Sequence, residues 1–143
     1  MPEPDTAPPV EGVLECALYA RDLQETTAFY RDILGLRLLL ETPRLVAFDA
    51  GGQSVLLVFQ QGATSADIVD ERGTIPGHDS AGRLHFALAI AASDLEVWRA
   101  RLAKAGVALT GEYRWPLGGV SLYFSDPDGA VVEPATPGVW STR

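Results

Sequence analysis

The chain has 143 residues, a hydrophobic fraction of 47% and a formal net charge of −8 at pH 7. A chain of this length forms one compact domain or two small half-domains that share a core. The acidic balance argues against a nucleic-acid partner, because phosphates require clusters of Lys and Arg. The sequence has neither a basic amphipathic stretch nor an apolar run of about 20 residues, so we expect no membrane partner.

Residues 1–11 begin with an acidic, proline-rich stretch. This stretch lacks the basic and apolar regions of a signal peptide, so we expect a disordered N-terminal tail and a cytoplasmic protein. Cys16 is the single cysteine and excludes an internal disulfide. It lies among apolar residues of a strand-like run, which predicts a small core residue rather than a reactive thiol.

Residues 12–60 predict a first βαβββ module. An alternating strand over 13–20 precedes Asp22, which is suited to cap a helix from 23 to 34 that ends at Gly35. Three strand-like runs follow, and a Gly-Gly turn at 51–52 separates the last two. These runs cover 36–40, 45–49 and 54–60.

The same pattern returns after residues 61–83, a polar, glycine-rich stretch that we interpret as a linker. In residues 84–137, a strand over 84–91 leads to a helix that begins at Ser93 or Asp94 and ends at Gly106. Three further strands are expected near 107–113, 120–125 and 130–134, and residues 138–143 form a C-terminal tail. The internal repeat therefore predicts an α+β fold of two βαβββ modules.

Three polar residues, Glu15, His85 and Glu133, stand in apolar strand-like runs. Glu15 and His85 also occupy matching points of the repeat. Burial of an unpaired carboxylate costs several kcal/mol unless the carboxylate is paired or binds a metal. The three residues therefore indicate a functional site.

Side-chain alternation predicts where this site lies. In the strand over 84–91, the bulky apolar residues share one face, while His85 and two small alanines share the other. Glu15 likewise shares its face with Ala17 and Tyr19. We therefore expect helices on the outer, bulky face of a mixed sheet that curves around a concave groove.

Two motifs in this order connect the chain to a known family: Phe-Tyr-x-x-x-Leu-Gly at 29–35 and Tyr-Phe-x-Asp-Pro-Asp-Gly-x-x-x-Glu at 123–133. With the matching strands around them, the chain resembles the vicinal oxygen chelate superfamily over almost all of residues 12–137. This superfamily includes glyoxalase I, fosfomycin-resistance proteins, bleomycin-resistance proteins and extradiol dioxygenases.

The resemblance implies a divalent metal in the groove, chelated by a substrate with adjacent oxygens. The ligand positions of the family fall on Glu15, His85 and Glu133. Two features depart from the family pattern. The first ligand position is more often His or Gln, whereas here it is Glu15. The position that matches Glu133 in the first module falls near Leu56 or Leu57, and leucine cannot bind a metal. Two carboxylates and one imidazole suit Mn, Fe, Zn, Ni or Mg, which the sequence does not distinguish.

Other polar and aromatic residues are candidates for the same groove. His78 and Tyr123 are candidate catalytic residues. The alternative for His78 is an exposed loop residue without a catalytic role, and the alternative for Tyr123 is a residue that only fills the core. Tyr19 shares the face of Glu15 and is a candidate groove residue. Arg114 and Trp115 could border the substrate groove or belong to an ordinary hairpin loop.

The sequence thus predicts a metal-dependent enzyme that acts on a small-molecule substrate with vicinal oxygens. Lyase, isomerase, dioxygenase and thiol-transfer reactions all remain open, and the resemblance implies a homodimer. One alternative is a metal-free small-molecule binding protein of the bleomycin-resistance type. Another is a degenerate protein with a structural or regulatory role.

Overall fold

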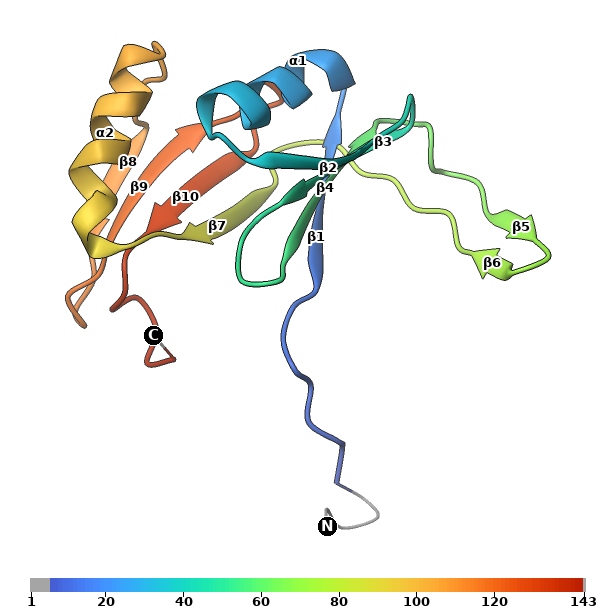
Figure 1. Cartoon of the computed structure of the whole chain (residues 1–143), viewed down its shortest axis with the longest axis horizontal. Coiled ribbons are helices and arrows are strands. Elements are labelled where there is room, and N and C mark those ends of the chain that lie inside the picture. Colours follow the sequence, from blue (N-terminus) through green and yellow to red (C-terminus); the bar gives the residue numbers. More distant parts are fainter. Residues whose placement is uncertain (1–5, 143) are drawn as a thin grey trace.

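The computed structural model describes residues 6–142 of the chain (Figure 1). The predicted disordered tail falls partly on residues 1–5, which lie outside the described residues, and 6–14 contain no helix or strand. None of the helices within 6–142 is both long and apolar enough to cross a bilayer.

The first module has the predicted order of elements. Its four strands form a mixed sheet in the order β1-β4-β3-β2, with β1 and β4 parallel. The elements are β1 (Glu15–Ala20), α1 (Leu23–Ala28), the π-helix η1 (Phe29–Ile33), β2 (Arg37–Glu41), β3 (Leu45–Asp49) and β4 (Val55–Gln60).

The predicted helix over 23–34 is present, but its second half winds as a π-helix. The Asp22 carboxylate accepts hydrogen bonds from the backbone N–H groups of Gln24 and Glu25, as expected for an N-cap. Gly35 has a φ of +70°, a backbone conformation that glycine adopts without a steric penalty, and the helical segment ends before it.

The second module repeats this architecture with the strand order β7-β10-β9-β8. The strand expected near 107–113 begins only at Gly111, because Val107 and Leu109 pack against the core without pairing in a sheet. The elements are β7 (His85–Ala89), the 3₁₀ turn η2 (Ala92–Asp94), α2 (Leu95–Lys104), β8 (Gly111–Arg114), β9 (Val120–Ser125) and β10 (Val131–Ala135).

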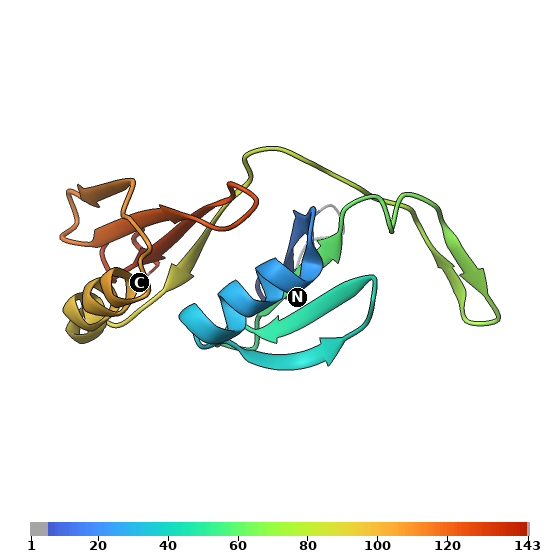
Figure 2. The same cartoon turned by 90° about the horizontal axis from the view of Figure 1, so that it is seen from above.

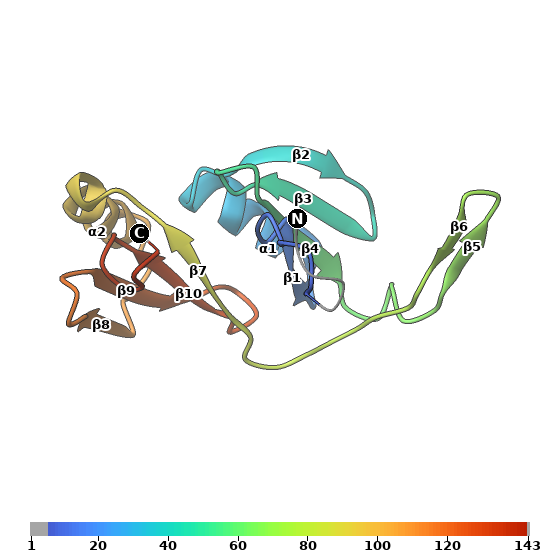
Figure 3. The ribbon, with the colours of Figure 1, turned by 90° about the horizontal axis from the view of Figure 1, so that it is seen from below.

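The stretch 61–83 between the modules contains a two-stranded hairpin that the sequence did not predict. Its strands are β5 (Ile68–Asp70) and β6 (Gly73–Ile75). Figures 2 and 3 show that this hairpin projects away from both sheets. The base of the hairpin is closed by a backbone hydrogen bond from His78 to Thr64, so the chain returns to the first module before it enters β7.

One hydrophobic core joins the two modules. Tyr30 is fully buried, and its ring lies 6.0 Å from Phe48 of its own module and 6.2 Å from Phe86 of the other. The Tyr30 hydroxyl donates a 2.7 Å hydrogen bond to the buried carboxylate of Asp126. Burial and the neighbouring Asp126 charge raise the pKa of Tyr30 far above its ordinary value, so the phenol stays a donor.

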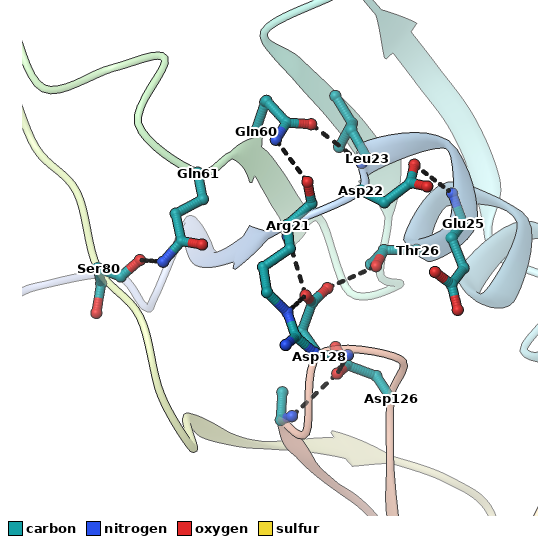
Figure 4. A network of polar contacts seen from close by, with 11 residues as sticks. Arg21, Asp22, Leu23, Glu25, Thr26, Gln60, Gln61, Ser80, Asp126 and Asp128 are labelled. Atoms are coloured by element: carbon teal, nitrogen blue, oxygen red, sulfur yellow. Dashed lines mark hydrogen bonds and ion pairs between the residues drawn. The ribbon is translucent and has the colours of Figure 1, made fainter.

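A polar network closes the same contact between the modules (Figure 4). Asp128, in the turn between β9 and β10, accepts hydrogen bonds from the backbone N–H and the guanidinium of Arg21. It also accepts a 2.7 Å bond from the Thr26 hydroxyl at α1. The modules are therefore joined on their helical side, which leaves the opposite face of each sheet open.

The strands β1 and β7 lie at the edges of their sheets. Within residues 6–142, no ladder of hydrogen bonds joins one four-stranded sheet to the other. The α+β fold with two βαβββ modules is thus confirmed, while each open edge keeps a row of backbone donors and acceptors that can pair with another strand.

Candidate metal centre

His85 and Glu133 come together on the open face of the second module. The parallel register of β7 and β10 pairs His85 with Val131 and Glu133 with Ala87, so the two side chains are neighbours on one face. The His85 Nε2 atom lies 3.1 Å from Glu133 Oε1. Glu133 is only 7% exposed, whereas the His85 side chain is 51% exposed toward the groove.

The other ring nitrogen of His85 determines what this pair can bind. His85 Nδ1 lies 3.0 Å from the carbonyl oxygen of Val131. A carbonyl oxygen only accepts, so Nδ1 carries a proton, and Nε2 of the uncharged form of the ring would then direct a lone pair toward the carboxylate. The two facing acceptors repel unless His85 is protonated or a cation lies beside both. The donor set therefore fits a divalent metal, since metal-bound histidines are commonly fixed in this way by a backbone carbonyl.

Two residues hold the Glu133 carboxylate in place. The Ser121 hydroxyl donates a 2.6 Å hydrogen bond to Glu133 Oε2, and it accepts a 2.8 Å bond from the indole N–H of Trp115. Ser121 is fully buried. The chain of donors orients the carboxylate and leaves Oε1 directed at His85.

Tyr123 stands on β9 beside this pair, with its ring centre 6.4 Å from that of His85. Burial is the main cause that raises the pKa of Tyr123. A hydrogen bond with Ser121 opposes it, while the charge of Glu133 and a hydrogen bond with this carboxylate add to it. The pKa lies above its ordinary value, so the phenol is protonated at neutral pH and can donate to a bound oxygen.

A cavity of about 450 Å³ lies over the pair. His85, Glu133 and Tyr123 are the ionisable groups of its lining, and Trp115 is a further aromatic residue there. The last part of the chain supplies further lining, including Pro137, Val139, Trp140 and Thr142. The volume is in the range of small-molecule sites.

Glu15 does not complete this centre within one chain. It is exposed at the first position of β1. Across residues 6–142, no group of three or more His, Cys, Asp or Glu side chains is arranged to hold a metal ion. The structure thus brings together two of the three predicted ligands and keeps the third on the other module.

Tyr19 and His78 meet each other on the first module. The Tyr19 hydroxyl lies 2.7 Å from His78 Nδ1, and both rings contact Phe59. Burial, followed by the charge of Asp79, raises the pKa of Tyr19. Neither Tyr19 nor His78 belongs to the lining of the cavity over His85.

Trp115 lines the cavity, but Arg114 does not. Arg114 alternates with Tyr113 along β8 and shares its side with Glu112, which pairs with Arg99 of α2. The structure therefore places Arg114 on the helical side of the sheet.

Ser121 and the C-terminal residues of the lining were not among the predicted site residues. Alternation along β9 puts Ser121 on the face of Tyr123, so this signal was present in the sequence. The return of Val139 and Trp140 to the cavity depends on the path of a loop, which strand periodicity does not encode.

Known proteins are similar to this chain in sequence and fold. The model of the Glyoxalase/Bleomycin resistance protein/Dioxygenase superfamily matches residues 12–133. Catechol-2,3-dioxygenase of Bacillus subtilis is 31% identical over 118 residues, which cover 81% of this chain and 38% of that protein. Metallothiol transferase FosB of Bacillus licheniformis is 32% identical over 130 residues, covering 90% of this chain and 77% of the relative.

A solved structure, lactoylglutathione lyase from Agrobacterium tumefaciens, superimposes with a TM-score of 0.84 at 34% identity. The match covers 94% of this chain and 99% of that one. By contrast, this chain spans less than half the length of the dioxygenase. The repeated modules, the extent of the family match and these relatives together show that the chain belongs to the glyoxalase/bleomycin resistance protein/dioxygenase superfamily.

Proposed function

We propose that this protein is a metal-dependent enzyme that acts on a small substrate with two adjacent oxygens. The observation that carries the proposal is the facing pair of His85 Nε2 and Glu133 Oε1 at the floor of a cavity. The relatives named as a dioxygenase, a thiol transferase and a lyase support this general class. The reaction would be a lyase, isomerase, thiol-transfer or dioxygenase reaction, carried out in the cytoplasm.

The residues of the cavity have separate roles in this proposal. His85 and Glu133 hold the metal, and Ser121 with Trp115 orients the carboxylate. A bound divalent metal supplies Lewis-acid chemistry, in which it draws electron density from the substrate oxygens. The protonated Tyr123 phenol donates a hydrogen bond to a substrate oxygen that gains negative charge. A bound substrate would displace water from the apolar walls, which would strengthen both interactions.

We further propose that the third ligand is Glu15 of a second copy of the chain. Glu15 and His85 occupy the first positions of β1 and β7, which are both edge strands. If β1 of one copy lies along β7 of the other, Glu15 comes beside His85. A two-fold homodimer would then contain two equivalent sites, because each copy supplies both parts.

Metal analysis provides the first test. Protein purified without chelator should contain a divalent metal, and both Glu15→Ala and Glu133→Ala should lose it. Glu41→Ala, which removes an exposed carboxylate on β2, is the control and should keep the metal.

Complementation distinguishes a shared site from one within a single chain. Glu15→Ala and Glu133→Ala protomers are mixed under conditions that exchange subunits. In a mixed dimer, one site receives both defects and the other receives none, so about a quarter of the wild-type metal content should return when pairing is random. If no metal returns although subunits exchange, Glu15 does not act across the dimer.

A protein that never binds a divalent metal would overturn the enzyme proposal. The metal-free binding protein of the bleomycin-resistance type would then take its place, since the cavity remains and a protonated His85 can pair with Glu133 as an ordinary ion pair.

A further inference from the structure

The C-terminal segment, residues 136–142, forms one wall of the cavity over His85 and Glu133. Trp140 is part of the lining, yet it is 73% exposed. An indole in this position offers a large apolar surface, and burial of such a surface is a major source of binding energy. A ligand in the cavity would cover part of this ring.

The wall is held against the loop between β8 and β9. The Thr136 hydroxyl accepts a 2.8 Å hydrogen bond from the backbone N–H of Val120, and the N–H of Gly119 donates to the carbonyl of Gly138 at 3.2 Å. A Cβ atom on Gly138 would lie 2.6 Å from the nitrogen of Gly119, and one on Gly119 would lie 2.7 Å from the carbonyl carbon of Gly138. Gly138 also has a φ of +104°. Both positions must be glycine for the two backbones to approach so closely, so this contact between Gly119 and Gly138 determines where the wall lies.

The charge of the cavity restricts what the wall can receive. Among the described residues, no Lys or Arg side chain lines it. The carboxylate of Glu133 and the imidazole of His85 lie in this lining, and both are the proposed metal ligands. Trp115 lies in the same lining, with its N–H already bonded to Ser121, so its ring acts as an apolar surface.

The open face of the first module has the same character. The residues that share the face of Glu15 along β1 and β4 are Ala17, Tyr19, Val55, Leu57 and Phe59. None of them carries a positive charge. A second copy that supplies Glu15 would therefore add apolar and aromatic surface along β1 and β4. Arg37, which shares this face on β2, is already paired with Asp49, and His78 is hydrogen-bonded to Tyr19.

We propose that residues 136–142 are a specificity wall, and that Trp140 binds the uncharged, flat apolar body of the substrate whose adjacent oxygens face His85 and Glu133. This inference rests on the proposed function for the chelating end of the substrate. The inference adds the chemical class of the rest of the substrate, which is an aromatic or similarly planar group without a phosphate, phosphonate or carboxylate.

Three probes test the wall by calorimetry under anaerobic conditions on Mn²⁺-loaded protein. They are 4-methylcatechol, which is uncharged and aromatic, 3,4-dihydroxybenzoate, which adds a carboxylate to the same ring, and acetohydroxamate, an aliphatic chelator. The wild type should bind 4-methylcatechol about tenfold or more tightly than 3,4-dihydroxybenzoate, because the carboxylate has no cationic partner.

Two variants should remove this preference selectively. Trp140→Ala deletes the ring and Gly138→Ala displaces the wall. Each variant should therefore lower the affinity for 4-methylcatechol by about tenfold. Both should keep the wild-type affinity for acetohydroxamate and for Mn²⁺. Leu117→Ala, an exposed residue of the adjoining loop outside the lining, is the control and should bind all three probes as the wild type does.

Three results would each contradict the proposed role of the wall. The first is unchanged affinity of Trp140→Ala for 4-methylcatechol, and the second is equal affinity of the wild type for 3,4-dihydroxybenzoate and 4-methylcatechol. The third is a change in oligomeric state as the sole effect of Trp140→Ala. The titration is repeated on metal-free protein. A loss of 4-methylcatechol affinity in Trp140→Ala there supports the wall even if Mn²⁺ does not bind, so failure of the metal site and failure of the wall are separate outcomes.

Discussion

The two modules have the same backbone but carry different chemistry on their open faces. In the parallel pairs, Glu15 lies opposite Val55 as His85 lies opposite Val131. The same register makes Leu57 the counterpart of Glu133. Of the two candidates that the sequence left open, Leu56 is instead fully buried in the core.

The difference extends to the residues that support the carboxylate. The counterparts of Ser121 and Tyr123 in the first module are Leu45 and Ala47, according to the antiparallel pairing of β3 with β4 and of β9 with β10. The second module thus has a carboxylate with its hydrogen-bond donors, while the first has aliphatic side chains at the same places. A duplicated backbone therefore contributes one supported ligand site and one largely apolar face, which bears Glu15 and, toward β2, the Arg37–Asp49 ion pair.

The largest effect should come from removal of the supported carboxylate. Glu133→Ala should reduce metal affinity by more than about 100-fold, because two of the three ligands cannot retain the ion. At a metal concentration of about 100 times the dissociation constant, the wild type gains about 2.7 kcal/mol of stability. Thermal melts with added Mn²⁺ or Zn²⁺ should show this gain in the wild type and in Glu41→Ala, but not in Glu133→Ala. An identical change in melting temperature for all three proteins with every divalent metal would contradict the proposal that the second module carries the metal site.

The contact that joins the modules should matter for stability and not for metal affinity. Tyr30→Phe removes the donor to the buried Asp126, which costs about 1–3 kcal/mol of unfolding free energy. Urea denaturation measures the loss. Tyr113→Phe on β8, where the side chain is exposed, should change stability by less than about 0.5 kcal/mol. Equal stability of the two variants would mean that the buried hydrogen bond does not hold the modules together.

The support of Glu133 can be weakened without loss of either ligand. Trp115→Phe keeps an aromatic ring but removes the indole N–H that donates to Ser121. Metal affinity should fall by about tenfold, the usual effect of a residue that orients a ligand. Isothermal titration with Mn²⁺ measures it, and Trp98→Phe on α2 serves as the matched control. Unchanged affinity in Trp115→Phe would show that Ser121 positions the carboxylate alone.

The smallest effect concerns the turn of the second module that reaches the first. Burial of Asp128 opposes its ionisation, but the N–H and guanidinium of Arg21 and the hydroxyl of Thr26 outweigh it, so the pKa of Asp128 is lowered. A lowered folded-state pKa stabilises the protein above the unfolded-state value, and this stability is lost as the pH falls through the folded-state value. Because the Arg21 side chain is 74% exposed, we expect only about 0.5–1 kcal/mol.

Urea denaturation of Asp128→Asn checks this sign. The variant should be less stable than the wild type at pH 7, and the difference should shrink at a pH below about 3.9, where the unfolded carboxyl is protonated. Asp94→Asn is the control, because the Asp94 side chain makes no capping hydrogen bond to its helix. A difference that grows toward acid would contradict the lowered pKa.

The sequence by itself determined the repeated βαβββ order, the Asp22 cap and the shared face of His85 with its alanines. These features follow from neighbours within a few residues, where strand alternation and helix caps act. It also predicted His85 and Glu133 as ligands of one site, because both stand in apolar strand-like runs and both fall on ligand positions of the family that the chain resembles.

Tertiary structure alone decided which groups surround that pair. The Trp115–Ser121–Glu133 chain, the Gly119–Gly138 contact and the hairpin β5–β6 depend on how distant segments pack. The separation of Glu15 from His85 has the same origin, because the buried Tyr30 and Asp126 join the modules on their helical side and leave β1 and β7 as open edges. Local periodicity fixes the face on which a side chain lies, whereas only the packed chain fixes what stands opposite it.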